Sequence, residues 1–267
     1  MDLTPYMSRE QEQPLDHIVT NGGFCGIFRT VVCIGDSLSS GEFESRKDGQ
    51  VGYHDYYEYS WGQFMARDAG LTVYNFSRGG LRANSFLEIA DGKGWYDEEK
   101  KARAYIIALG VNDINGVIRG ELEFGTVADI DPADEKNNKQ TFAGYYGSII
   151  TKYKKMQPKA KFFLVTCPRE PGRPEIQAMY DKHAALLYEI AALFEGCYVL
   201  DLRRYAPVYD AEFHRYFYLG GHLNASGYRL TALMVESYID YIIRHNPEDF
   251  KQIGFVGTRH HNELAKW

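Results

Sequence analysis

Short runs of apolar, β-favouring residues alternate with longer helical stretches between about residues 30 and 244 of this chain of 267 residues. Five runs predict strands at Thr30–Ile34, Leu71–Phe76, Ala104–Leu109, Lys161–Thr166 and Cys197–Leu202. The helical stretches predict helices near Ser60–Ala69, Phe142–Met156, Glu175–Phe194 and Ser226–Arg244. Because strands separated by helices form right-handed crossovers, the alternation predicts an α/β fold with a mostly parallel, doubly wound sheet.

The alternation is unbroken, which predicts a single domain over residues 1–267, with residues 1–29 as an N-terminal extension and residues 247–267 as a C-terminal tail. The segment Gly110–Gln140 is a long insertion after the third predicted strand. Insertions of this size often form walls or lids of functional sites. Its acidic part, Asp129–Glu135, lacks the glycine and the terminal glutamate that a calcium loop needs, so we interpret it as a solvated acidic turn.

Composition and charge exclude several classes of protein. With 45% hydrophobic residues, the chain has ample apolar side chain for a core, which excludes a disordered protein. A formal charge of −6 with mixed signs leaves no basic stripe for a nucleic acid. The N-terminus is polar and no apolar run approaches the roughly 18 residues of a membrane span, so we predict a cytoplasmic protein.

The four cysteines, which are Cys25, Cys33, Cys167 and Cys197, show no CxxC spacing. This pattern favours buried free thiols in a reducing compartment over zinc ligands or disulfides.

A serine follows the first predicted strand directly, in the segment Gly35-Asp36-Ser37-Leu38-Ser39. A side chain just past the end of a central parallel strand lies at the sheet edge where α/β proteins bind ligands. Ser37 is therefore a candidate nucleophile, although a serine in this position also serves as a helix cap in many proteins.

Two further segments follow the second and third predicted strands. Gly79-Gly80 would let a backbone N–H approach a ligand closely, and Asn112 offers a neutral amide donor. Asp113 beside it could hold the loop. Near the C-terminus, His222 follows Gly220-Gly221 just before the last predicted helix, in a loop where a histidine is free to titrate. Each feature alone also fits ordinary turn chemistry, but their order along the chain points to one site.

Taken together, these segments resemble the SGNH hydrolases, also called the GDSL esterase-lipase family. The resemblance covers about residues 30–244 and implies a flavodoxin-like three-layer α/β/α sandwich with a five-stranded parallel sheet. It assigns Ser37 as the nucleophile and His222 as its base. The oxyanion hole would consist of the backbone N–H groups of Ser37 and Gly80 and the side-chain amide of Asn112.

The chain departs from the family at one position, because the family has an aspartate three residues before the histidine and Leu219 stands there. Asp210 or Glu212 could supply a carboxylate if the segment folds back. Alternatively, the carbonyl of Leu219 could accept a hydrogen bond from His222 Nδ1 and leave a Ser-His dyad. Loss of the orienting carboxylate costs orders of magnitude in rate in Ser-His-Asp enzymes.

The sequence therefore supports two functions. The first is a serine esterase that cleaves a small-molecule acyl ester, with small acyl groups on carbohydrate among the substrates, and needs no metal or organic cofactor. The second is a binding protein of the same fold with weak or no turnover. The tyrosine-rich segment Tyr53–Tyr59 would line the entrance to the site and contact a polar or sugar-like ester, or it is an ordinary surface loop.

Overall fold

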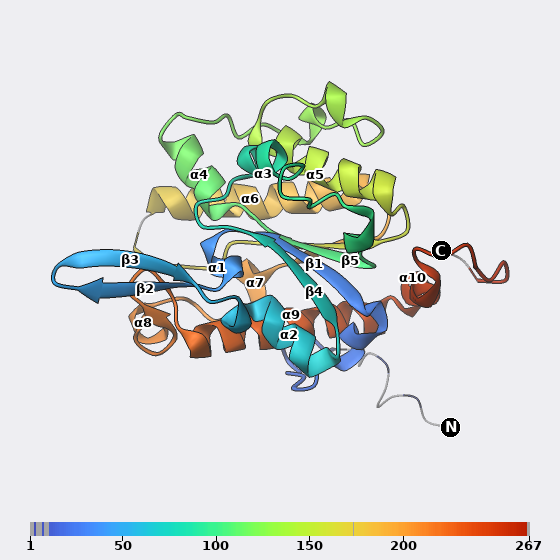
Figure 1. Cartoon of the computed structure of the whole chain (residues 1–267), viewed down its shortest axis with the longest axis horizontal. Helices are drawn as coiled ribbons and strands as arrows, with labels where there is room; N and C mark the ends of the chain where they lie inside the picture. Colours follow the sequence, from blue (N-terminus) through green and yellow to red (C-terminus); the bar gives the residue numbers. More distant parts are fainter. Residues whose placement is uncertain (1–2, 4–6, 8–10, 173, 266–267) are drawn as a thin grey trace.

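A five-stranded parallel sheet forms the centre of the computed structural model, which describes residues 3, 7, 11–172 and 174–265 (Figure 1). Its strands are β1 Thr30–Gly35, β4 Thr72–Ser77, β5 Ala104–Ala108, β6 Lys161–Val165 and β7 Cys197–Leu200. They lie in the order β4-β1-β5-β6-β7, and each neighbouring pair is parallel. The first strand of the sheet thus lies between the second and the third, which is the flavodoxin-like order.

Helices cover both faces of this sheet (Figure 1). On one face lie α2 Trp61–Ala69 and α9 Ala225–His245, which contact each other. The other face carries α3 Ala83–Ile89, α5 Phe142–Met156 and α6 Pro174–Leu193. The predicted three-layer α/β/α sandwich is confirmed.

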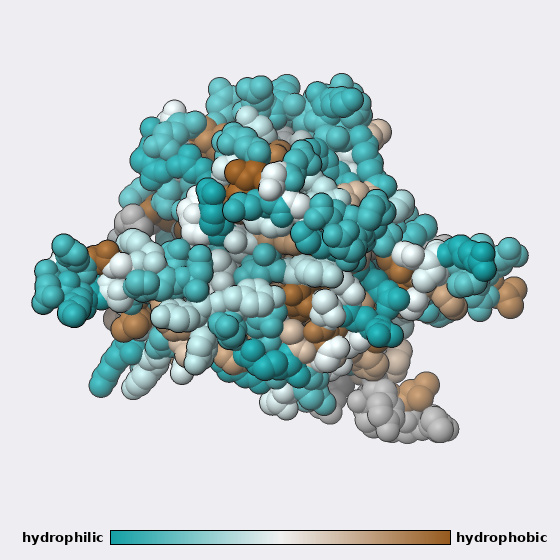
Figure 2. Space-filling view, in the orientation of Figure 1, coloured by the Kyte–Doolittle hydropathy of each residue, from teal (hydrophilic) through white to brown (hydrophobic). Residues whose placement is uncertain are grey.

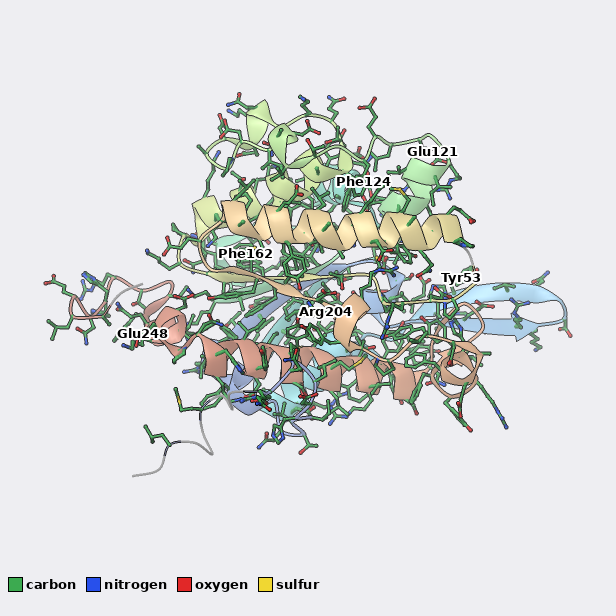
Figure 3. The ribbon with its side chains drawn as sticks, turned by 180° about the vertical axis from the view of Figure 1, so that it is seen from behind. Tyr53, Glu121, Phe124, Phe162, Arg204 and Glu248 are labelled. Atoms are coloured by element: carbon green, nitrogen blue, oxygen red, sulfur yellow. The ribbon has the colours of Figure 1, made fainter. Side chains whose placement is uncertain are left out.

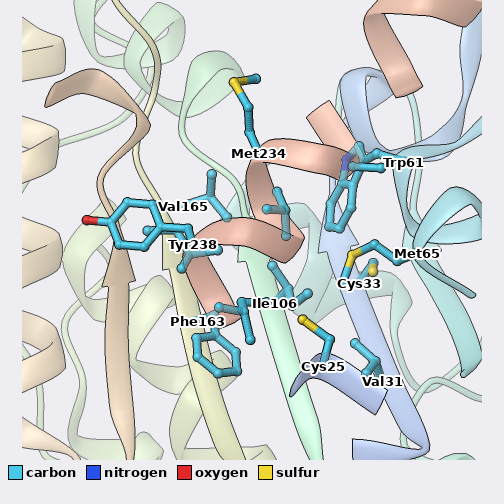
Figure 4. Packing of buried hydrophobic residues seen from close by; sticks show 14 of the residues in the cluster. Cys25, Val31, Cys33, Trp61, Met65, Ile106, Phe163, Val165, Met234 and Tyr238 are labelled. Atoms are coloured by element: carbon cyan, nitrogen blue, oxygen red, sulfur yellow. The ribbon is translucent and has the colours of Figure 1, made fainter. Parts of the chain in front are cut away.

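The two cores follow from the alternation of side chains along each strand. Val31 and Cys33 of β1 point to the core under α2 and α9, whereas Val32 and Ile34 point to the core under α3, α5 and α6. Figure 4 shows the first of these cores, in which Trp61 of α2 joins Cys33. Because both faces are buried, the strand is apolar throughout, and this made it recognisable in the sequence.

Shorter elements surround the sandwich. The remaining helices are α1 Ser37–Ser40, α4 Val111–Ile118, α7 Leu202–Tyr205, α8 Ala211–Phe217 and α10 Pro247–Phe250. The 3-10 turns are η1 Gly23–Phe28, η2 Tyr57–Tyr59, η3 Glu98–Lys100, η4 Val127–Asp129, η5 Glu135–Asn137 and η6 Ile253–Phe255. Two antiparallel ribbons pair β2 Glu42–Lys47 with β3 Gln50–Asp55 and β8 Tyr218–Leu219 with β9 His222–Leu223.

The β2–β3 hairpin was not predicted, and it extends from the body of the molecule at the left of Figure 1. Its strands are largely exposed and lack an apolar alternation, because they cover little of the core. The local signal is its two-residue turn, Asp48-Gly49, where both residues have positive φ angles of 53° and 78°. An Asp-Gly pair is typical of such a turn.

The sequence also did not predict the four-residue helices α1, α7 and α10 or three somewhat longer ones. α3, α4 and α8 are only seven or eight residues long, and α4 lies within the predicted insertion Gly110–Gln140. Its sequence VNDINGVI has poor helix formers, so tertiary packing of the fully buried Ile114 stabilises it instead of intrinsic propensity.

Two chain-wide properties complete the description. Cys25, Cys33 and Cys167 are buried and Cys197 is partly buried, all as free thiols. Within the described ranges, no helix has both the length and the apolar character required to cross a bilayer.

The central strand β5 gives a direct test of the two-sided core. Ile106→Ala removes a fully buried side chain and should lower the free energy of unfolding by about 2–5 kcal/mol. The matched control Ile118→Ala changes a side chain that is 44% exposed and should stay within about 0.5 kcal/mol of wild type. Urea denaturation measures both, and equal effects would contradict this packing.

Candidate active site

Ser37 begins the short helix α1 immediately after β1, at the carboxyl edge of the sheet. The preceding residue, Asp36, caps this helix, because its side chain accepts a hydrogen bond from Leu38 N at 3.0 Å. The hydroxyl of Tyr228 on α9 donates to the Ser37 carbonyl at 3.1 Å. The backbone on both sides of the candidate nucleophile is therefore fixed, and Ser37 itself is partly buried.

Asn112 lies directly beside this turn. Its Nδ2 donates to Asp36 Oδ2 at 3.1 Å and weakly to the Leu81 carbonyl at 3.5 Å. The loops after β1 and β5 are thus joined through one amide group. Asp36 is only 2% exposed, and burial raises the pKa of its carboxyl to about 6.

Gly79 and Gly80 follow β4 and face the same site. Gly80 has a φ angle of 72°, a left-handed conformation that favours glycine. A Cβ atom on Gly79 would collide with the carboxylate of Glu42, the first residue of β2. The absence of a side chain at Gly79 therefore lets this loop lie against the hairpin.

Asp113 connects the loop after β4 with the loop after β5 and is fully buried. Its Oδ1 accepts a hydrogen bond from Ala83 N, the first residue of α3, at 2.8 Å. This is the loop-holding role expected from the sequence. Burial raises the pKa of its carboxyl to about 7.

His222 reaches the site from the β8–β9 ribbon, which lies close to α1. Its Nε2 is 3.0 Å from Glu42 Oε1 and its Nδ1 is 3.9 Å from Glu44 Oε2. Tyr53 of β3, on the hairpin half nearer to the body in Figure 3, contacts the imidazole edge-on, with ring centroids 5.4 Å apart. Among the described residues, no hydrogen bond joins Ser37 to His222, and Nδ1 has no partner within bonding distance.

The groups considered for orienting His222 lie elsewhere. Asp210 caps α8, accepting hydrogen bonds from the backbone N–H groups of Glu212 and Phe213 at 3.0 and 2.9 Å. Glu212 is exposed, and the Leu219 carbonyl accepts no bond from Nδ1. In their place stand Glu42 and Glu44, which share one face of β2 because residues two apart in a strand point the same way.

A small pocket opens beside the nucleophile turn. Its wall includes Asp36, Leu38, Val111 and Cys167, and its volume is about 80 Å³, room for only a few water-sized groups. Within the part of the chain that the structure describes, no group of three His, Cys, Asp or Glu side chains could hold a metal ion.

The sequence profile of the GDSL-like Lipase/Acylhydrolase family matches residues 33–230. The chain belongs to this family of ester-hydrolysing enzymes. The match runs from β1 to α9 and so includes all three strand-end loops and His222.

The fold is also similar to the folds of several solved structures. A lipase/acylhydrolase from Enterococcus faecalis is 18% identical, with a TM-score of 0.53 over 79% of this chain and 95% of that one. A family two carbohydrate esterase from Clostridium thermocellum, in complex with cellohexaose, is 14% identical, with a TM-score of 0.58 over 80% of this chain and 64% of that one. An acetyl xylan esterase is 18% identical, with a TM-score of 0.50 over 79% of this chain and 99% of that one. No curated protein sequence matches the chain.

The buried carboxyl of Asp113 predicts a pH dependence of stability. Its pKa is about 7 in the folded protein against 3.8 ordinarily, so the folded state holds the proton more tightly than the unfolded state. The stability that this group contributes is present below about pH 4 and is lost as the pH rises through about 7. Asp113→Asn removes the titration. As the pH rises from 4.5 to 7.5, the urea midpoint of wild type should therefore fall relative to that of Asp113→Asn. A difference that stays constant over this range would contradict the assignment.

Proposed function

We propose that the protein is a serine esterase that removes small acyl groups from neutral esters, with Ser37 as the nucleophile and His222 as its base. One observation chiefly supports this function: the turn that bears Ser37 is tied to Asn112 by the Asp36–Asn112 hydrogen bond of 3.1 Å. The same turn is tied to Glu42 by the Tyr228 hydroxyl, which donates to the carbonyls of both Ser37 and Glu42. Glu42 in turn contacts His222.

In the proposed reaction, His222 Nε2 takes the proton of the Ser37 hydroxyl as its oxygen attacks the ester carbonyl. The resulting oxyanion accepts hydrogen bonds from the Ser37 and Gly80 N–H groups and from Asn112 Nδ2. The protonated imidazole then donates its proton to the departing alcohol. A water molecule attacks the acyl-Ser37 ester in the same way and releases the acid, which restores the Ser37 hydroxyl.

Glu42 occupies Nε2 before this reaction begins, at 3.0 Å. We propose that an entering ester displaces this carboxylate, since Ser37 needs the same nitrogen. Burial raises the pKa of the Glu42 carboxyl above its ordinary value. The ionised carboxylate is therefore less stable in the site than in water, which favours its displacement.

The chemistry of the pocket supports a particular substrate class. The cavity of about 80 Å³ is lined by Asp36 and Leu38, on either side of Ser37 in sequence, and would take a short acyl group better than a fatty acyl chain. Asp36, Glu42 and Glu44 surround the histidine and the nucleophile turn, so they would repel phosphate-bearing esters. An ester of a short acyl group with a sugar or another neutral polyol has both a small acyl group and no phosphate. Tyr53 would contact its polyol part. Relatives of the same fold include a carbohydrate esterase and an acetyl xylan esterase.

A binding protein of this fold without efficient turnover is the second candidate. The pairing of His222 Nε2 with Glu42 instead of Ser37 is the observation that favours it. Such a protein would bind the same neutral ligands but would not depend on the Ser37 hydroxyl.

Replacement of the nucleophile separates the two functions. Ser37→Ala should lower kcat for p-nitrophenyl acetate by roughly 10⁴-fold or more, because no covalent intermediate can form. The control Ser226→Ala removes an exposed hydroxyl four residues after His222 and should retain wild-type turnover. Circular dichroism melts check that both variants fold. Equal turnover in Ser37→Ala and wild type would rule out the esterase.

The oxyanion donor gives an independent prediction. Asn112→Ala should lower kcat by about 10²–10³-fold with little change in KM, because the amide interacts most strongly with the charge that develops in the transition state. Asn115→Ala makes the same chemical change on the same helix and should have no effect on kcat. Steady-state kinetics with p-nitrophenyl acetate measure both variants. A change confined to KM would indicate that Asn112 binds the ground state only.

A further inference from the structure

Accepting the proposed roles of Ser37 and His222, on which this step rests, we infer that Glu44 replaces the family's missing aspartate as the residue that positions His222. It stands 3.9 Å from Nδ1 of His222, on the ring nitrogen opposite the one that must face Ser37. Glu44 comes from the β2–β3 hairpin, whereas the family's acid precedes the histidine in sequence. The position normally held by that acid is Leu219, whose side chain is 53% exposed.

Glu44 is fixed in place by its surroundings. Its side chain is 5% exposed, its Oε2 accepts a hydrogen bond from Gly221 N at 2.6 Å, and its Oε1 pairs with Arg46 Nε at 2.9 Å. A Cβ atom on Gly220 would collide with the same carboxylate, so the glycine pair before His222 lets the loop close over it. The Gly221 N–H and the Arg46 guanidinium hold the pKa of Glu44 below its ordinary value. An ionised, immobile acceptor therefore lies beside the histidine loop.

The histidine offers the matching group. Nδ1 of His222 is buried and has no hydrogen-bond partner in the described structure. A buried ring nitrogen without a hydrogen-bond partner is unfavourable. Once Glu42 leaves Nε2, a small rotation of the imidazole would bring a protonated Nδ1 within hydrogen-bond distance of Glu44 Oε2. The resulting bond would keep the proton on Nδ1, leave Nε2 free to accept from Ser37, and stabilise the imidazolium that forms during the reaction.

Glu42 cannot take this role while Ser37 acts through Nε2, because Glu42 contacts that nitrogen itself. The Tyr53 ring contacts the imidazole. The charged groups around the two glutamates are Arg46, which pairs with Glu44, and Asp55 of β3, which accepts from the Ser40 hydroxyl and acts electrostatically on Glu42. Of the carboxylates, Glu44 alone approaches Nδ1 among the described contacts.

The test compares Glu44→Gln with wild type in kcat, KM and the pH profile of kcat/KM for p-nitrophenyl acetate. Glutamine can still accept the Gly221 N–H, so the loop contact is kept while the charge is lost. We expect kcat to fall by about 10²–10⁴-fold with little change in KM. The acid limb of the profile should move to lower pH, since the imidazolium loses a negative neighbour. Glu44→Asp should recover part of kcat.

Two controls accompany these variants. Asp48→Asn removes a carboxylate from the exposed turn of the same hairpin and should leave kcat and the pH profile unchanged. Glu42→Gln should retain far more kcat than Glu44→Gln. Thermal melts check that all variants fold. If Glu44→Gln does not, Glu44→Asp takes its place: its shorter carboxylate should lower kcat and leave the acid limb in place, and wild-type kcat in this variant would overturn the inference.

Several results would overturn the inference. These are wild-type kcat in Glu44→Gln, a loss of kcat without any shift of the acid limb, or a loss in Glu42→Gln that exceeds the loss in Glu44→Gln. Each is distinct from failure of the esterase itself. If wild type shows no turnover that depends on Ser37, the proposed function fails; if that turnover is present and Glu44→Gln leaves it intact, only the role of Glu44 fails.

Discussion

The parallel pairing of β1 with β4 on one side and β5 on the other determines where the rest of the site can be. Gly35 at the end of β1 is level with Ser77 of β4 and with Ala108 of β5. Three loops therefore leave the sheet at the same height and in the same direction. Parallel pairing requires crossover helices, and these helices bury both faces of the sheet. The packing of the two cores thus holds the carboxyl edge, with Ser37, Gly80 and Asn112 on adjacent loops.

Carboxylates dominate the chemistry around this edge. Burial raises the pKa of Asp36 and Asp113, whereas backbone and guanidinium partners lower the pKa of Glu44. Burial also raises the pKa of Glu42, so the four acids divide by position and not by pKa. Asp36 and Asp113 connect the loops that carry the proposed oxyanion donors, whereas Glu42 and Glu44 of strand β2 lie near the two ring nitrogens of His222. In the proposed esterase, these acids would favour neutral substrates over phosphate-bearing ones.

Local patterns in the sequence were sufficient to predict the five strands, the four long helices and their layering. Strands such as Thr30–Gly35 are buried on both faces and therefore apolar along their whole length. The β2–β3 hairpin is exposed and polar, so hydrophobic pattern could not reveal it, and Asp48-Gly49 is the one local signal that it left. The division of the chain into a domain with an extension and a tail stays a prediction, as does the cytoplasmic location.

The residues of the candidate site divide in the same way. The sequence was sufficient to predict the candidate residues that lie in recognisable segments, which are Ser37, Gly80, Asn112 and His222. Glu42 and Glu44 could not be nominated, because the contact between Glu44 and the histidine loop joins residues 177 positions apart. Asp210 and Glu212 are nearer to His222 in sequence. However, Asp210 caps the N-terminus of α8, and Glu212 is exposed to solvent. Proximity along the chain therefore does not indicate which carboxylates lie near His222.

Covalent labelling by a fluorophosphonate, with the modified residue mapped by peptide mass spectrometry, tests most directly whether His222 activates Ser37. A serine activated by a histidine is phosphonylated in preference to ordinary surface hydroxyls, because its proton is removed as the bond to phosphorus forms. We expect a single adduct, on Ser37, that disappears in His222→Ala. Absence of an adduct on Ser37, or an adduct that persists at the same rate without His222, would contradict this activation.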